Sequence, residues 1–207
     1  MMTDVIRHYD LLIGEGNDPV DDPEPLRQYM DGWDGRLFLS ALALDGTQDV
    51  LEIGVGTGRM ALRTALDCRS FTGVDLSPAS IERAAQHLSG RANVRLLCAD
   101  FMTWETTERF NVIYSTLTFM HIADKLGAAQ RIALLLKPGG RAVISLDKSQ
   151  SDVLDYGTRQ LRIYPDDPHR MAAHLREAGL FILPMQETEF AYLLTAIREG
   201  EDKRWGF

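Results

Sequence analysis

The sequence contains few cysteines, no long apolar run and no excess of basic residues. Its two cysteines, Cys68 and Cys98, form neither a CxxC pair nor a zinc-ligand pattern, so no disulfide framework and no metal site are expected. A reducing cytoplasm is the predicted compartment. No apolar stretch of about 18 residues is present, and Met1–His8 lacks the basic-then-apolar layout of a signal peptide, so no membrane association is expected.

The negative charge is unevenly distributed along the chain. The formal net charge is −8, and residues 1–35 hold nine acidic and two basic residues. Neither this segment nor the nearly neutral remainder offers the basic surface that a phosphate backbone requires, so nucleic acid is not expected as a partner. We interpret the acidic segment as a solvated surface, with a site for a cationic substrate as the alternative.

From residue 49 onward, short apolar runs alternate with helical patterns, which predicts an α/β fold with a mostly parallel sheet between helices. The first five predicted strands are Asp49–Ile53, Phe71–Asp75, Val94–Cys98, Val112–Ser115 and Arg141–Leu146. Phe181–Pro184 and Phe190–Arg198 complete a seven-stranded sheet that ends in an antiparallel pair. One domain over residues 1–207 is expected, with residues 46–200 as its core.

The predicted helices have recognisable start and stop residues. Ser77 and Asp167 each precede a proline, as helix N-caps do, and Pro138-Gly139-Gly140 is expected to end a helix over Leu126–Leu136. Near the N-terminus, Val5–Ile13 and Gln28–Leu44 are predicted helices. The segment 17–25 between them holds three prolines and is predicted to be neither helix nor strand.

The stretch Glu52-Ile53-Gly54-Val55-Gly56-Thr57-Gly58 joins a buried strand to a helix predicted near Arg59. Alternating glycines let the backbone turn sharply and approach a ligand closely. A dinucleotide fingerprint starting at Gly54 requires glycine or alanine where Arg59 stands, and the Gly-Lys-Ser/Thr of a P-loop is absent. Asp75, at the end of the second strand, is placed to accept hydrogen bonds from both hydroxyls of a ribose.

With these motifs, the chain resembles the class I, Rossmann-like S-adenosylmethionine-dependent methyltransferases. Five segments resemble that family's motifs in the family's order: Glu52–Gly58, Gly73–Ser77, Cys98–Phe101, Phe110–Ser115 and Leu136–Gly140. The resemblance implies that S-adenosylmethionine is the cofactor, that S-adenosylhomocysteine is the product, and that residues 1–45 form a helical lid. It also implies a seven-stranded sheet whose last strand is antiparallel.

The resemblance further implies cofactor-binding roles for Glu52, Gly54, Gly56, Gly58, Asp75, Leu76, Asp100, Phe101, Ser115 and Thr116. By this resemblance, Gly54 and Gly56 would let the backbone pass close to the methionine moiety, and Glu52 would face its ammonium group directly or through a water molecule. Asp75 would hold the ribose, Leu76 would pack on the adenine, and Asp100 would accept from the adenine amino group. Ser115 and Thr116 would lie beside the sulfonium.

Residues for the methyl acceptor are less clearly indicated. His121 follows the fourth strand and can act as a base near neutral pH, or it can be a packed helix-start residue. The other candidates for the lid or the acceptor wall are Tyr9, Tyr29, Tyr156, Arg162 and Tyr164. Tyr9 and Tyr29 could instead be core aromatic residues. Arg162 and Tyr164 could instead be outward-facing residues of a short strand.

The predicted function is methyl transfer to an oxygen or nitrogen of a small molecule, by a monomer or homodimer. Ser115-Thr116-Leu117-Thr118-Phe119 differs from the Asp/Asn-Pro-Pro-Tyr/Phe motif of amide and amino-base methyltransferases, which disfavours adenine and glutamine acceptors. A non-catalytic module that binds the cofactor is the first alternative. A nicotinamide oxidoreductase, which Arg59 contradicts, and an aminopropyl transferase, which the acidic segment would suit, are the others.

Overall fold

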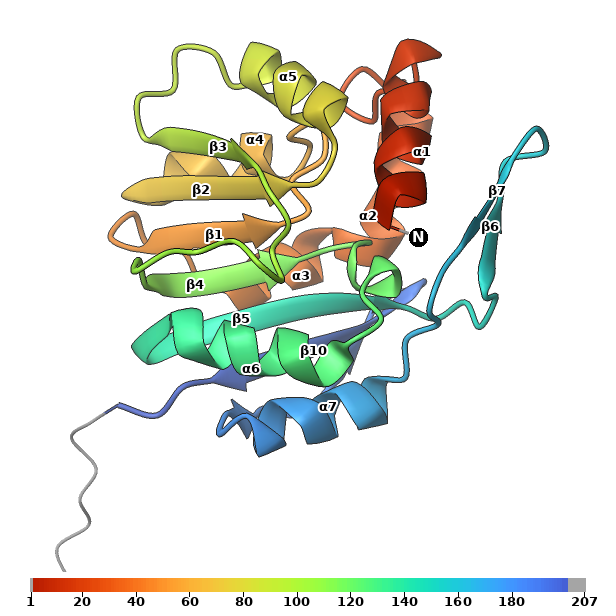
Figure 1. Cartoon of the computed structure of the whole chain (residues 1–207). Helices are drawn as coiled ribbons and strands as arrows, with labels where there is room; N and C mark the ends of the chain where they lie inside the picture. The colour runs from red at the N-terminus through yellow and green to blue at the C-terminus, as the bar shows by residue number, and fades with distance from the viewer. Residues whose placement is uncertain (1, 201–207) are drawn as a thin grey trace, which may run out of the picture.

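A central sheet of eight strands runs through the structure (Figure 1). The computed structural model describes residues 2–200. The strands of the sheet are β1 (Asp49–Ile53), β2 (Ser70–Asp75), β3 (Val94–Cys98), β4 (Phe110–Ser115), β5 (Leu136–Asp147), β8 (Phe181–Ile182), β9 (Gln186–Glu187) and β10 (Ala191–Ile197). They lie in the order β3-β2-β1-β4-β5-β10-β8, with β9 also paired to β10.

The first five strands of the sheet are parallel, and β10 runs antiparallel to β5. A second, two-stranded antiparallel sheet consists of β6 (Val153–Asp155) and β7 (Gln160–Arg162). This hairpin stands beside the main sheet rather than in it (Figure 1). The predicted α/β class and the antiparallel last strand are confirmed.

Helices cover both faces of the main sheet. They are α1 (Met2–Gly14), α2 (Glu24–Asp34), α3 (Arg36–Leu42), α4 (Ala61–Thr64), α5 (Pro78–His87), α6 (Lys125–Leu135) and α7 (Pro168–Glu177), with short 3-10 helices η1 (Ala65–Asp67) and η2 (Phe119–His121). None of the described helices has the length and apolar character that crossing a membrane requires.

Two apolar clusters, one on each face, hold these layers together. On β1, Leu51 and Ile53 join the cluster under α6 and α7, whereas Val50 joins the cluster under α3 and α5. Successive side chains of a strand point to opposite faces, so a strand buried on both faces shows the continuous apolar run seen in the sequence. Packing of β1 in both clusters therefore fixes the position of the glycine loop that follows it.

Two predicted caps are present in the structure. The Ser77 hydroxyl accepts from the backbone N–H of Ser80 at the start of α5, and Asp167 accepts from the N–H groups of His169 and Arg170 at the start of α7. Each cap satisfies backbone donors that the first turn of a helix leaves free.

Three boundaries differ from the prediction in ways that proline and glycine explain. The strand expected over Phe181–Pro184 stops at Ile182, and β9 adds a separate short pairing, which makes eight strands. Proline has no N–H to donate to a sheet ladder. The helix expected over Gln28–Leu44 starts at Glu24 and breaks at Gly35, whose backbone is not helical.

The third difference concerns Pro138-Gly139-Gly140, which lies within β5 rather than in a turn before it. Gly139 has a φ of +78°, and the pairing register with β4 shifts between Phe110 and Val112. A glycine tolerates this left-handed conformation, so the strand continues through an irregularity.

The helix expected from Arg59 is also short, because α4 has only four residues before η1 follows. A single turn aligns few peptide dipoles, so the N-terminus of α4 adds little positive charge behind the glycine loop.

Candidate functional site

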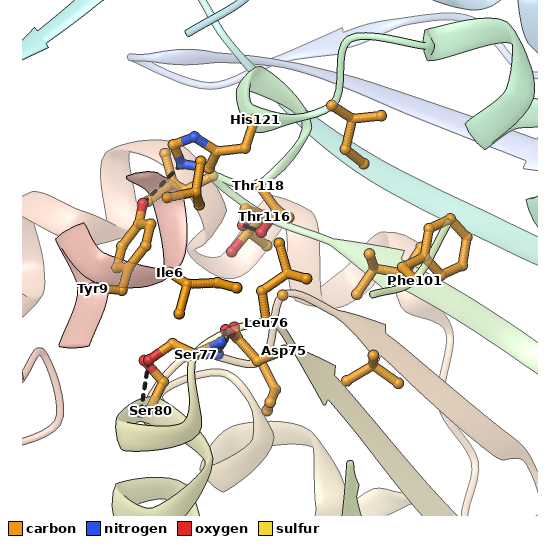
Figure 2. Close-up of a pocket in the computed structure, with 18 of the residues that line it drawn as sticks. Ile6, Tyr9, Asp75, Leu76, Ser77, Ser80, Phe101, Thr116, Thr118 and His121 are labelled. Carbon is orange, nitrogen blue, oxygen red and sulfur yellow. Dashed lines mark hydrogen bonds between the residues drawn. The ribbon is translucent and has the colours of Figure 1, made fainter. Parts of the chain in front are cut away.

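A cavity of about 710 Å³ opens at the carboxyl ends of the parallel strands (Figure 2). Its floor comes from the loops after β1, β2, β3 and β4, and α1 and the β6–β7 hairpin supply the opposite wall. In Figure 1 the arrowheads of β1, β2 and β4 point toward α1. Ligands of open parallel sheets bind at this edge, because the connecting loops converge there.

The glycine loop and Asp75 form one connected unit on the floor. The Asp75 carboxylate accepts from the backbone N–H of Gly56 (2.8 Å) and of Ser77 (2.9 Å). Burial raises the pKa of Asp75, and the backbone hydrogen bonds oppose that change. These bonds hold the carboxylate at the cavity wall, and each oxygen keeps lone-pair capacity for a further donor.

Gly54 and Gly56 have positive φ angles of +77° and +53°. A Cβ added at Gly54 would lie 2.0 Å from the Thr118 hydroxyl oxygen, whereas one added at Gly56 would project into open space. Both glycines line the cavity, so Gly56 leaves room for a ligand and Gly54 leaves room for Thr118. Gly58 does not line the cavity, and its absent Cβ lets Leu88, the residue directly after α5, pack closely.

Glu52 is buried at one end of the cavity, with 2% of its surface exposed. The Tyr114 hydroxyl donates to its Oε2 at 2.9 Å, and burial raises the pKa of Glu52 well above the usual range. Nearby, Arg59 pairs with the fully buried Asp34 through two hydrogen bonds. Arg59 is therefore committed to holding α2 against the glycine loop.

The loops after β2, β3 and β4 supply four of the other predicted residues. Leu76, Asp100, Phe101 and Thr116 line the cavity. Asp100 accepts from the backbone N–H of Met102 at 2.8 Å. Ser115 departs from the expectation because it is fully buried, does not line the cavity, and donates its hydroxyl to the Ile53 carbonyl at 2.9 Å. It ties β4 to β1 instead.

Tyr9 of α1 and His121 of η2 meet across the cavity (Figure 2). Their hydroxyl and Nε2 atoms are 2.8 Å apart. Burial is the main cause that lowers the pKa of His121 to about 4 and also raises the pKa of Tyr9 above its usual value. At neutral pH the imidazole is uncharged and Tyr9 keeps its proton, so the tyrosine can donate to the histidine.

Of the remaining candidates, Tyr156, Arg162 and Tyr164 line the cavity from the hairpin and the segment after it. Tyr29 does not line the cavity. It is 53% exposed and its ring packs on Trp33 and Phe190, at centroid distances of 5.4 and 5.1 Å. It belongs to the outer side of α2.

The sequence did not indicate several residues that shape the site. Ile6 and Leu12 of α1 line the cavity beside Tyr9, and Met30 of α2 does so farther along. The apolar face of the predicted first helix could have indicated Ile6 and Leu12. Asp10 anchors α1, because its Oδ1 accepts from the Ser77 hydroxyl (2.7 Å) and from the Ala79 N–H (3.2 Å). No sequence signal indicates that this carboxylate reaches α5.

One trio of possible metal ligands exists in the described part of the chain: Asp18, Asp21 and His87. Arg83 lies 3.4 Å from the buried Oδ2 of Asp18, and His87 Nε2 lies at the same distance. The other ring nitrogen of His87 bonds the carbonyl of Thr57 in the glycine loop. A guanidinium already neutralises Asp18, so we assign no metal to this trio.

Comparison with known proteins identifies the central part of the chain. Residues 50–140 match a family model described as a methyltransferase domain. An uncharacterized methyltransferase of Mycobacterium tuberculosis is 36% identical over 108 residues, which are 52% of this chain and 54% of that protein. Phosphoethanolamine N-methyltransferase 1 of Triticum aestivum is 32% identical over 144 residues, which are 68% of this chain and 27% of that protein. The matches thus span about half or less of these relatives' length.

The fold has well-matched neighbours among solved structures. Magnesium protoporphyrin IX methyltransferase from Synechocystis PCC 6803, solved with bound S-adenosylmethionine, aligns with a TM-score of 0.76 over 96% of this chain and 97% of that chain, at 15% identity. The family match contains the glycine loop, Asp75 and His121, but neither α1 nor the hairpin. Together the family match and the fold confirm the resemblance read from the five motifs: the chain carries a class I, S-adenosylmethionine-dependent methyltransferase domain.

Proposed function

We propose that this chain transfers a methyl group from S-adenosylmethionine to an oxygen or nitrogen of a small molecule. The observation that carries the proposal is one continuous cavity. The glycine loop and Asp75 lie on its floor, and the Tyr9–His121 pair joins the α1 wall to the segment after β4.

The floor of the cavity fits S-adenosylmethionine. Gly56 leaves open space in front of its backbone, the Asp75 carboxylate faces the cavity, and Leu76 and Phe101 offer apolar surface for a base. Glu52, at the far end, suits the ammonium group of the methionine moiety, because a buried carboxyl group gains from a nearby cation. These residues would hold the cofactor with its sulfur toward Thr116.

The enclosed shape favours a small acceptor. The wall made by α1 and the hairpin lies directly over the floor, so a bulky macromolecular surface would have to displace it. The name of the wheat relative states a small phosphorylated amine as its substrate, which supports the same class here.

When bound, S-adenosylmethionine supplies a methyl group whose carbon–sulfur bond breaks, leaving the electron pair on sulfur, as the acceptor's lone pair forms the new bond. The chain contributes by holding the two reactants in line and excluding water. Neutral His121 takes up the proton that the acceptor loses by way of Tyr9: the tyrosine hydroxyl receives the acceptor's proton as it passes its own to Nε2 of His121. The acceptor loses one proton and His121 gains one, so this pair is sufficient to account for the proton.

Calorimetric titration with S-adenosylmethionine, S-adenosylhomocysteine and NADH tests the cofactor site. We expect micromolar binding of the first two ligands, weakened at least ~10-fold in Asp75→Ala because two ribose hydroxyls lose a charged acceptor. Asp152→Ala, which changes an exposed carboxylate outside the cavity lining, is the matched control. Binding of NADH in place of the other two would show that the glycine loop takes a nicotinamide cofactor.

Turnover separates an enzyme from a module that only binds the cofactor. A panel of hydroxyl, carboxyl, amine and polyamine acceptors is incubated with the chain and S-adenosylmethionine, and S-adenosylhomocysteine is measured. We expect product with at least one acceptor and at least ~100-fold less in His121→Gln. Cofactor binding without product on the whole panel would favour the non-catalytic module.

A further inference from the structure

One arginine that lines the cavity forms no ion pair with any of the residues that the structure describes. Two arginines line the cavity, Arg59 and Arg162. Arg59 is paired with Asp34. For Arg162, the described residues 2–200 provide neither an ion pair nor a side-chain hydrogen bond. A cation held at the wall of a binding cavity without an internal partner is available to a ligand.

The position of Arg162 is built into the fold. On the strand β7 and just after it, Leu161 and Ile163 are buried, so Arg162 and Tyr164 lie on the other face, toward the cavity. The backbone N–H of Ile163 donates to the Asp152 carbonyl (2.8 Å), and that of Tyr164 donates to the Met120 carbonyl (2.7 Å). A slip of the strand by one residue would expose two buried apolar side chains, so the register is well determined.

The neighbouring arginine of the same hairpin shows the contrast. Arg159 donates to both carboxylate oxygens of Glu15 on α1, at 2.6 and 2.7 Å, and to Nδ1 of His8 at 3.2 Å. Arg159 therefore fastens the hairpin to α1. Arg162, three residues on, has no such structural duty among the described residues.

The carboxyl groups that line the cavity are already engaged elsewhere. Glu52 accepts from Tyr114 and Asp75 accepts from two backbone N–H groups. Asp100 accepts from the backbone of Met102, and Asp124 caps α6 through the N–H of Gly127. Within the described part of the chain, none of these four carboxyl groups forms an ion pair with Arg162, whose side chain is exposed and keeps its N–H donors for another partner.

We propose that Arg162 binds an anionic group, a carboxylate or a phosphate, of the methyl acceptor. The inference rests on the proposed function and names the substrate class of that same site. A guanidinium presents a planar fork of N–H donors that matches both anions. Tyr9, Tyr156 and Tyr164 line the cavity together with Arg162, so the acceptor joins an apolar or aromatic body to one anionic group.

Binding of matched probes to the chain saturated with S-adenosylhomocysteine tests the proposal. The probes are 4-hydroxybenzoate, phenyl phosphate and the uncharged 4-hydroxybenzamide, and their affinities are measured by calorimetry at low and at high salt. We expect an anion to bind at least ~10-fold more tightly than the amide, with a preference that weakens at high salt. The better of the two anions identifies the carboxylate or the phosphate as the preferred group.

Three variants assign that preference to Arg162. Arg162→Gln is expected to remove it, Arg162→Lys to keep part of it, and Arg162→Glu to reverse it. Arg170→Gln, which changes an exposed arginine of α7 outside the cavity lining, is expected to bind like the unaltered chain.

Two results would overturn the proposal: no anionic probe binding better than the amide, or an unchanged preference in Arg162→Gln. S-adenosylhomocysteine is titrated first into every variant. Its failure to bind the unaltered chain would contradict the proposed function, whereas its normal binding with no anion preference would contradict the role of Arg162 alone.

Discussion

At the scale of single residues, burial sets the protonation of the groups that face the cavity. Glu52 and His121 are both driven toward their neutral forms, because a buried charge loses its hydration. The Tyr114 hydroxyl bonds Glu52 but carries no charge to offset that loss. A positively charged ligand would change this balance at Glu52, since its ammonium group would stabilise the carboxylate.

The first prediction concerns protons released when the cofactor binds. If Glu52 is neutral in the free chain and ionised beside an ammonium group, binding of S-adenosylmethionine releases up to one proton near neutral pH. Calorimetry in buffers of different ionisation enthalpy measures this number, and Glu52→Gln should release fewer protons. The same count in both proteins would show that Glu52 keeps its charge state.

The second prediction concerns the pH dependence of turnover. Because burial lowers the pKa of His121 to about 4, the imidazole stays neutral and available as a base across the neutral range. With an acceptor that does not itself titrate, kcat should stay level from about pH 8 to about pH 5 and fall only near pH 4. A break near the ordinary histidine pKa of 6.5 would contradict the assignment of His121 as a buried base.

At the scale of elements, α1 is a wall of the cavity that polar anchors hold at two places. Asp10 bonds the first turn of α5 through Ser77 and Ala79. Glu15 bonds the hairpin through Arg159. Figure 1 shows α1 between these two elements, against the open ends of the strands. Because α1 forms part of the cavity wall, these anchors influence the rates at which a ligand enters and leaves.

The third prediction tests the Asp10 anchor. Asp10→Ala removes two hydrogen bonds to α5 and leaves the floor of the cavity intact, so S-adenosylhomocysteine should dissociate several-fold faster. The free energy of unfolding should fall by about 1–3 kcal/mol. Stopped-flow displacement and thermal unfolding measure the two effects, with Asp152→Ala as control. An unchanged dissociation rate would indicate that α1 does not limit release.

At the scale of the whole molecule, histidines stabilise the junction between α1, the hairpin and the main sheet only while they are neutral. Burial lowers the pKa of His8, and the Arg159 guanidinium beside it acts in the same direction. His121 contacts Tyr9 of α1 from the far side of the cavity. Protonation at either histidine would place a charge where the fold offers too little compensation.

The fourth prediction follows from the sign of these changes. A histidine whose folded pKa lies below its unfolded value of about 6.5 contributes stability that is complete above that pH and is lost as the pH falls toward the folded pKa. The contribution of His121 lost between pH 6.5 and 4 is on the order of 3 kcal/mol. Thermal unfolding should therefore shift down over this range, and less so in His121→Gln. An unfolding temperature that does not change between pH 6.5 and pH 4 would contradict this prediction.

The local elements were predictable because their signals are short-range. The strands near Asp49–Ile53 and Val94–Cys98 match their predicted bounds, since a buried apolar run between turn residues needs no distant partner to be recognised. Ser77 and Asp167 were identified as caps for the same reason. The glycine loop was also visible, because its spacing carries a backbone requirement.

The site was only partly predictable. Asp75, Asp100 and Thr116 lie at strand ends, and parallel topology brings those ends to one edge, so they line the cavity. Ser115 is the exception, because the alternation of side chains along β4 turns it to bond β1 instead. The sequence alone does not show that Thr116 lines the cavity and Ser115 does not, because this depends on the exact residue at which β4 ends.

The sequence alone therefore determined the class of fold and the cofactor motifs, because both depend on periodicity and spacing within short segments. The tertiary structure decided which distant side chains share the acceptor end. Tyr9 and Tyr29 both belong to N-terminal helices, yet Tyr9 bonds His121, 112 positions away, while Tyr29 packs outside. That choice depends on how α1 and α2 dock against the sheet, and long-range docking leaves no signature in a single segment of the chain.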